Sequence, residues 1–169
     1  MRKINLLLII LISALVIHSC ERDDICAEST PTTPQIIFRF FDSINREDLS
    51  TVNDLMVFGL DDNNERVNLI NILSAVDTDS IALPLRTDID ETRFLFIENT
   101  NDTINENIDT LSVAYLRRDV FISRACGFAN NFDEIQITVA NDTLNWIMDS
   151  EVIRENVEDE TSAHVQIFH

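Results

Sequence analysis

The stretch Gln35-Ile36-Ile37-Phe38-Arg39-Phe40-Phe41-Asp42 decides the fold class of this chain. It is rich in branched and aromatic residues, which are typical of strands. Because successive side chains of an extended chain point to opposite faces, Ile36, Phe38 and Phe40 share one face. The stretch therefore predicts a β-strand with one face in a hydrophobic core.

Several later segments have the same character. Ser80–Leu85 contains Pro84, which cannot donate a ladder hydrogen bond, so we expect an edge strand there. Thr92–Glu98 has apolar residues on both faces, which favours a central strand. Further strands are predicted over Asp54–Leu60, Gln136–Ala140 and Ala163–Phe168.

Two segments are ambiguous. Val67–Val76 places its apolar residues at a helical spacing, but its length and asparagine content also allow a strand. Leu144–Val157 fits a strand at its start or a short helix, with Trp146 as a core or sandwich-edge aromatic residue.

A hairpin is predicted near the second half of the chain. Leu111, Val113 and Tyr115 alternate, we expect Arg117-Arg118-Asp119 to turn, and Val120–Cys126 would return. Gly127, one of two glycines, is expected to turn the backbone sharply, with Phe128 packed next to it.

Seven or eight short strands separated by polar turns, with at most one or two short helices, predict an antiparallel β-sandwich. An immunoglobulin-like label would describe architecture alone, because the cysteine spacing is not that of antibody domains. We expect a tether over residues 20–34 and one folded domain over 35–169.

The amino terminus has the pattern of a secretory signal. Arg2 and Lys3 precede the apolar segment Ile4–Ile17, and small Ser19 precedes Cys20. This order resembles the bacterial lipobox, which implies cleavage after residue 19 and acylation of Cys20. Glu21 follows in place of the aspartate that tends to retain lipoproteins at the inner membrane, so we expect attachment to the outer membrane. The sequence leaves open whether the protein faces the periplasm or the cell surface.

The chain is strongly acidic. Its formal charge of −18 becomes −20 when Arg2 and Lys3 leave with the signal, and no lysine remains. Such a charge repels phosphate backbones, so we expect no nucleic-acid partner. It is also unsuited to lying flat on an anionic membrane.

Cys26 and Cys126 remain once Cys20 is acylated. An even pair in an oxidising compartment usually forms a disulfide, and we expect one here. The alternatives are a reactive thiol pair, whose members normally lie close in sequence, or metal ligands, which usually come at short paired spacings.

We find no catalytic constellation in the sequence. It contains no G-x-S-x-G, no H-E-x-x-H and no phosphate-binding glycine loop, and His164 is interpreted as a sheet histidine with a local hydrogen bond. Three acidic stretches could each supply oxygen ligands to calcium, although hydrated turns explain them as well: Asp61–Glu65, Asp77–Asp79 and Asp88–Glu91. We therefore assign no catalytic residue, metal ligand or cofactor.

The mature chain resembles a family of uncharacterised lipoproteins of Bacteroidetes, especially flavobacteria. The likeness lies in the early Asp23-Asp24-Ile25-Cys26, in Ser123-Arg124-Ala125-Cys126-Gly127-Phe128 and in the closing His164-Val165-Gln166-Ile167, with further matches at Ile37–Asp42, Leu83–Leu85 and Asn145–Ile147. The resemblance implies a lipidated β-domain and no particular activity.

The function expected from these observations is that of a non-enzymatic binding or structural module of the outer envelope, meeting a protein or glycan. The alternative is an envelope hydrolase or a calcium-dependent carbohydrate-binding protein, whose acidic residues would converge in the folded chain.

Overall fold

The computed structural model describes residues 25–27, 30, 32–68 and 74–169 of the 169-residue chain. The predicted signal peptide, the predicted acylation site Cys20 and much of the predicted tether lie outside the described residues. So does the middle of the ambiguous segment Val67–Val76. In the described part, all regular structure is β-strand, and no helix is long and apolar enough to cross a membrane.

The chain divides into two compact units. The larger, here called the sandwich unit, comprises Pro31–Val120 and Ala129–His169. The smaller, here called the hairpin unit, comprises Phe121–Phe128 and the described residues of Met1–Thr30.

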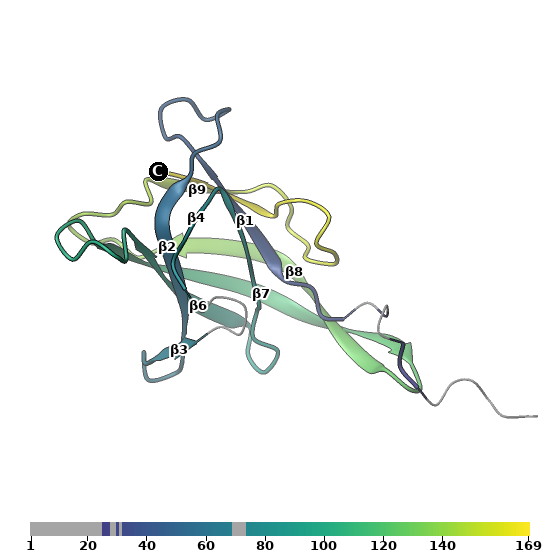
Figure 1. The fold of residues 1–169 in the computed structure, drawn as a ribbon. Coiled ribbons are helices and arrows are strands. Elements are labelled where there is room, and N and C mark those ends of the chain that lie inside the picture. The colour runs from purple at the N-terminus through teal and green to yellow at the C-terminus, as the bar shows by residue number, and fades with distance from the viewer. Residues whose placement is uncertain (1–24, 28–29, 31, 69–73) are drawn as a thin grey trace, which may run out of the picture. The chain divides into compact units, whose positions relative to one another are not determined.

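In the part of the chain that the structure describes, ten strands, several of which are labelled in Figure 1, form two sheets. The four-stranded sheet has the order β5-β1-β10-β9, formed by Ser80–Leu83, Ile36–Phe41, Val165–Phe168 and Asp149–Val152. The six-stranded sheet has the order β3-β2-β6-β7-β8, formed by Arg66–Asn68, Val52–Leu60, Glu91–Glu98, Asn107–Ser123 and Gly127–Val139. Its remaining strand, β4 (Val76–Thr78), also pairs with β2.

The predicted β-sandwich is confirmed, and so are the positions of two strands. β5, which precedes Pro84, is an edge strand, and β6 lies between β2 and β7. One strand pair of the described residues differs from the antiparallel arrangement that the sequence predicts. β1 pairs with β10 in parallel, with Phe38 opposite Val165 and Phe41 opposite Phe168.

The core forms where β1 and β6 face each other. Ile36, Phe38 and Phe40 of β1 have no exposed surface, as their alternation predicts. The Phe38 ring lies edge-on to Phe94 and Phe96 of β6, with ring centroids 6.3 and 5.6 Å apart. Edge-to-face aromatic pairs between the two sheets therefore fill the centre of the sandwich.

The predicted position of the hairpin turn is wrong. β7 continues through Arg117–Asp119 to Ser123, and the turn falls at residues 124–126, before β8. The charged residues remain in the strand because their partners lie beside it: Arg117 pairs with Asp90, and Arg118 with Asp133 of β8. Gly127 has a φ of 73°, a left-handed conformation that favours glycine, so its predicted role in the turn is confirmed.

Where they are described, the ambiguous segments contain short strands and no helix. β3 and β4 lie at the two ends of Val67–Val76, and β9 lies within Leu144–Val157. Trp146 is 5% exposed, which confirms it as a core residue. At the other end of the domain, Pro34 is buried and the Thr33 hydroxyl accepts a 3.0 Å bond from the Asn130 N–H. The end of the predicted tether thus packs against β8.

Candidate binding site

A cleft of about 370 Å³ opens where β2 ends. It is bounded by the end of β2 and the loop after it, by one residue of β3, by the segment after β5 and by the start of β6. Its lining residues are Gly59–Asn63, Val67, Pro84–Arg86 and Thr92. All of them belong to the sandwich unit.

The apolar part of the cleft is accessible to a ligand. Val67 is 47% exposed and Pro84 is also exposed, whereas Leu85 is only 6% exposed and joins the core beneath them. An apolar surface with polar groups at its edge is common in ligand sites. The cleft could thus contact a ligand with mixed apolar and polar surface.

Asp61 organises one wall of the cleft. Its Oδ1 accepts bonds from the backbone N–H groups of Asn63 at 2.8 Å and Glu65 at 2.7 Å. These bonds, with the Glu65 N–H contributing most, hold the pKa of the Asp61 carboxyl below its ordinary value. Asn64 takes a left-handed φ of 63° in the same turn. The loop is therefore fixed by its own side chains.

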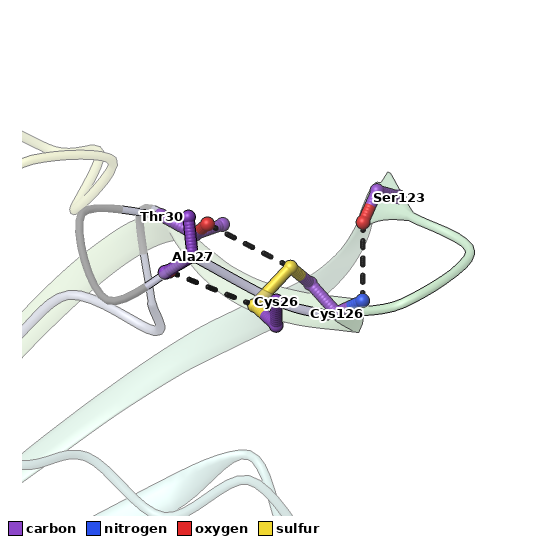
Figure 2. The surroundings of a disulfide bond; sticks show 5 residues. All are labelled: Cys26, Ala27, Thr30, Ser123 and Cys126. Carbon is purple, nitrogen blue, oxygen red and sulfur yellow. Dashed lines mark hydrogen bonds between the residues drawn. A yellow bond between two sulfur atoms is a disulfide. The ribbon is translucent and has the colours of Figure 1, made fainter. Parts of the chain in front are cut away.

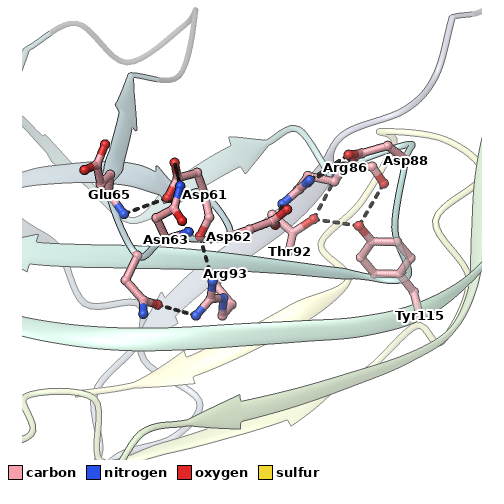
Figure 3. A network of polar contacts seen from close by, with 10 residues as sticks. Asp61, Asp62, Asn63, Glu65, Arg86, Asp88, Thr92, Arg93 and Tyr115 are labelled. Carbon is pink, nitrogen blue, oxygen red and sulfur yellow. Dashed lines mark hydrogen bonds and ion pairs between the residues drawn. The ribbon is translucent and has the colours of Figure 1, made fainter.

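Arg86 joins two acidic loops at the rim of the cleft (Figure 3). Its guanidinium makes two bonds to Asp88, Nε to Oδ1 at 3.0 Å and Nη2 to Oδ2 at 2.6 Å, and donates through Nη1 to Asp62 Oδ1 at 2.6 Å. Hydrogen bonds from Arg86 lower the pKa of Asp88 to about 2. Asp88 thus stays ionised and compensates the arginine, and Asp62 adds a second ion pair to the same guanidinium.

A ring of buried hydrogen bonds lies below Arg86. The Thr92 and Tyr115 hydroxyl oxygens are 2.6 Å apart, and the Arg86 backbone closes the ring. Its N–H donates to Thr92 Oγ1 at 2.8 Å, and its carbonyl accepts from the Tyr115 hydroxyl at 2.8 Å. Burial raises the pKa of Tyr115 above its ordinary value, so the phenol stays a donor at neutral pH. Strands β6 and β7 thereby hold the backbone of the cleft wall.

The acidic stretches noted in the sequence meet different partners. Asp61–Glu65 and Asp88–Glu91 come together at Arg86, whereas Asp77 accepts a bond from the Asp54 N–H at 2.8 Å. Among the residues that the structure describes, no group of three or more histidine, cysteine and acidic side chains is arranged to hold a metal ion. Calcium binding by these loops stays a prediction.

Cys26 and Cys126 form the predicted disulfide (Figure 2). Their Cα atoms are 4.9 Å apart across a sequence separation of 100 residues. The Cys126 N–H donates to Ser123 Oγ at 3.0 Å, and Thr30 Oγ1 lies 3.7 Å from Cys126 Sγ. The bridge thus ties the residues after the predicted anchor to the turn between β7 and β8.

His164 is buried and has the local hydrogen bond that its place in the sheet predicts. Its Nδ1 accepts from the Ile37 N–H at 3.0 Å, and the backbone N–H of His164 donates to the Ile37 carbonyl at 2.9 Å. The side chain thus continues the pairing of β1 and β10 beyond the end of the ladder. A histidine whose acceptor nitrogen is used by the backbone is suited to a structural role.

Sequence reasoning missed Arg86, Thr92 and Tyr115 as parts of the site. A signal was present for two of them. Thr92 lies on the same face of its strand as the buried Phe94 and Phe96. Tyr115 likewise shares a face with the buried Leu111 and Val113, so both hydroxyls point inward. A buried hydroxyl needs a hydrogen-bond partner, which could have suggested a network.

Fold and site together define a disulfide-bonded β-sandwich protein with an open, mixed-polarity cleft. The chain belongs to DUF6452, a family of unknown function, whose profile matches residues 54–169. The matched region contains the whole cleft and Cys126, and begins after Cys26. Searches of the curated proteins and of the solved structures give no match.

Proposed function

We propose that this protein is a lipoprotein of the bacterial outer envelope, acylated at Cys20 and attached to the outer membrane, where it acts as a non-enzymatic binding or structural module. The signal-like residues 1–19 and the position of Cys20 support the anchor. The Cys26–Cys126 disulfide supports an oxidising compartment, because such bonds are rare in the cytosol. The resemblance to lipoproteins of Bacteroidetes points the same way.

One observation favours binding over catalysis, namely that the polar groups of the cleft already satisfy each other. Arg86 is held by Asp62 and Asp88, and the Thr92 and Tyr115 hydroxyls close a ring on the Arg86 backbone. A reaction centre needs a nucleophile beside a base or an acid free to exchange protons. These groups instead fix the walls of a cleft whose exposed Val67 and Pro84 are left to meet a partner.

A protein loop or a glycan would suit this cleft. Both can present apolar surface to Val67 and Pro84, with polar groups at the edge of the contact. The hydrolase or calcium-dependent alternative is not favoured by any contact in the described residues, because Asp62 and Asp88 are engaged by Arg86.

The anchor is tested by metabolic labelling with palmitate. We expect label in the full-length protein and none in Cys20→Ser, which keeps the folded domain unchanged. An unlabelled wild-type protein would contradict the proposed attachment. Protease treatment of intact cells would then show whether the anchored domain is exposed at the surface.

The cleft is tested by crosslinking in outer membranes and by a glycan array, using wild type and Val67→Asp. A carboxylate at this exposed apolar position should reduce partner capture several-fold by adding charge to the contact surface. Ile153→Asp is a matched control, since Ile153 is 45% exposed and lies outside the cleft. Equal capture by wild type and Val67→Asp would contradict the cleft as the binding site.

A further inference from the structure

The hairpin unit carries an aromatic pair that the core does not use. Phe121 and Phe128 are 57% and 69% exposed, and their ring centroids lie 5.3 Å apart. They flank the turn that contains Cys126, and Ile25, next to the bridged Cys26, is 84% exposed. Apolar side chains gathered on one exposed turn mark an interaction surface.

The charge of this turn differs from that of the rest of the chain. Residues 121–128 contain Arg124 and no acidic residue, although the mature chain has a formal charge of −20. Arg124 is exposed. The turn itself is thus cationic and apolar, whereas Glu21, Asp23 and Asp24 precede Cys26 on the other side of the bridge.

The disulfide limits how far this patch can lie from the predicted anchor. Six residues lead from Cys20 to Cys26, a reach of about 20 Å when fully extended. Cys26 is bonded to Cys126, two residues before Phe128. Any lipid attached at Cys20 therefore keeps the aromatic pair near a bilayer surface.

We propose that the turn between β7 and β8 is a second membrane contact, in which Phe121 and Phe128 enter the lipid interface and Arg124 meets the phosphate groups. This inference rests on the proposed acylation of Cys20. Aromatic side chains beside a cationic group suit the boundary between headgroups and acyl chains. The lipid and the turn together fix the hairpin unit at the surface, which a single flexible attachment would leave free.

Tryptophan fluorescence of the full-length acylated protein tests the contact. Phe121→Trp is purified with its lipid and reconstituted into vesicles of phosphatidylethanolamine with a minority of phosphatidylglycerol. Native Trp146 serves as a constant background, because it is 5% exposed. We expect the acrylamide quenching constant of the new tryptophan to fall several-fold relative to Cys20→Ser/Phe121→Trp expressed without residues 1–19, and brominated lipids to quench its emission.

Leu144→Trp provides the matched control reporter, since Leu144 is 75% exposed and follows the other end of β8. It should remain accessible to acrylamide on the same vesicles. Equal shielding at positions 121 and 144 would overturn the proposal by showing general adsorption.

Two further outcomes separate this proposal from the proposed function. An acylated protein that floats with vesicles but leaves the tryptophan at position 121 accessible would overturn the contact and leave the anchor intact. A protein without an acyl group by mass spectrometry that does not float would overturn both. Shielding that rises with protein concentration in the absence of vesicles would overturn the lipid contact in favour of contact between copies.

Discussion

The Thr92 hydroxyl lies 2.6 Å from the Tyr115 hydroxyl, and this buried pair connects two neighbouring strands to the wall of the cleft. Both side chains project from the six-stranded sheet, Thr92 from β6 and Tyr115 from β7. Because each hydroxyl also bonds the backbone of Arg86, the pair positions a residue that neither strand contains.

Removal of the Tyr115 hydroxyl should destabilise the domain. Tyr115→Phe leaves the Arg86 carbonyl and the Thr92 hydroxyl short of a partner in a buried place, which costs about 1–3 kcal/mol. Urea unfolding of wild type and variant measures the difference. Thr138→Val on β8 is a control, because its exposed hydroxyl should contribute less than about 0.5 kcal/mol. Equal stability of Tyr115→Phe and wild type would contradict the network.

The disulfide should make a large contribution to stability. A bridge closing 100 residues restricts the unfolded chain, and loop closure of this length corresponds to about 4–5 kcal/mol. We expect Cys26→Ser/Cys126→Ser to lower the free energy of unfolding by roughly this amount, as measured with urea. Adding reductant to wild type should reproduce the loss and leave the double variant unaffected. Identical unfolding midpoints with and without reductant would argue against the bridge.

Low pH should reduce the stability of the domain because His164 is buried. Burial lowers its pKa below the ordinary value, with the Arg154 charge acting in the same direction, while Asp159 and Glu160 oppose the shift. The unfolded chain therefore takes up a proton near pH 6.5 that the folded chain binds only at lower pH. Stability from this group is complete above that pH and declines as the pH falls, by at most about 1.4 kcal/mol per unit.

His164→Asn isolates this effect. The asparagine Oδ1 can accept the Ile37 N–H in place of Nδ1, and the new side chain does not titrate. Unfolding measured between pH 7.5 and pH 5 (about the range over which an unperturbed histidine titrates) should decline less steeply for the variant. His169 is present in both proteins, so its titration cancels. Parallel stability curves would show that His164 does not cause the acid sensitivity.

The pKa of Asp88 should report on the ion pair that it forms with Arg86. Its pKa is about 2 because Arg86 donates two hydrogen bonds to it. In Arg86→Ala we expect the pKa to return toward about 4, the ordinary aspartate value. Carbon-detected NMR titration of the Asp88 carboxyl measures the shift, with Asp102, which bonds Asn105 and its own loop backbone, as a carboxyl that should not move. An unchanged pKa of Asp88 in Arg86→Ala would contradict the bidentate pair between the two side chains.

Local patterns predicted the strands well because burial on a sheet face has a period of two. Ile36, Phe38 and Phe40 could be assigned to one buried face from their spacing alone. The hairpin turn was misplaced because Arg117–Asp119 looks like a polar turn. In the folded chain these charges occupy an exposed strand, since Asp90 and Asp133 lie within reach.

The candidate site was less predictable. Each acidic loop could be recognised in the sequence, but its partner could not, because a carboxylate can bind calcium or pair with arginine. That choice depended on the segment after β5 carrying Arg86 to the loop after β2.

The sequence by itself determined most strand segments, the edge position of the strand that ends before Pro84 and the cysteines available for a bridge, since each follows from local periodicity, backbone chemistry or residue count. Only the tertiary structure decided that β10 lies parallel to β1 and that Arg86, Thr92 and Tyr115 form one network. The physical reason is that these pairings join residues far apart in the chain. Their geometry depends on how whole strands pack, which a local pattern does not contain.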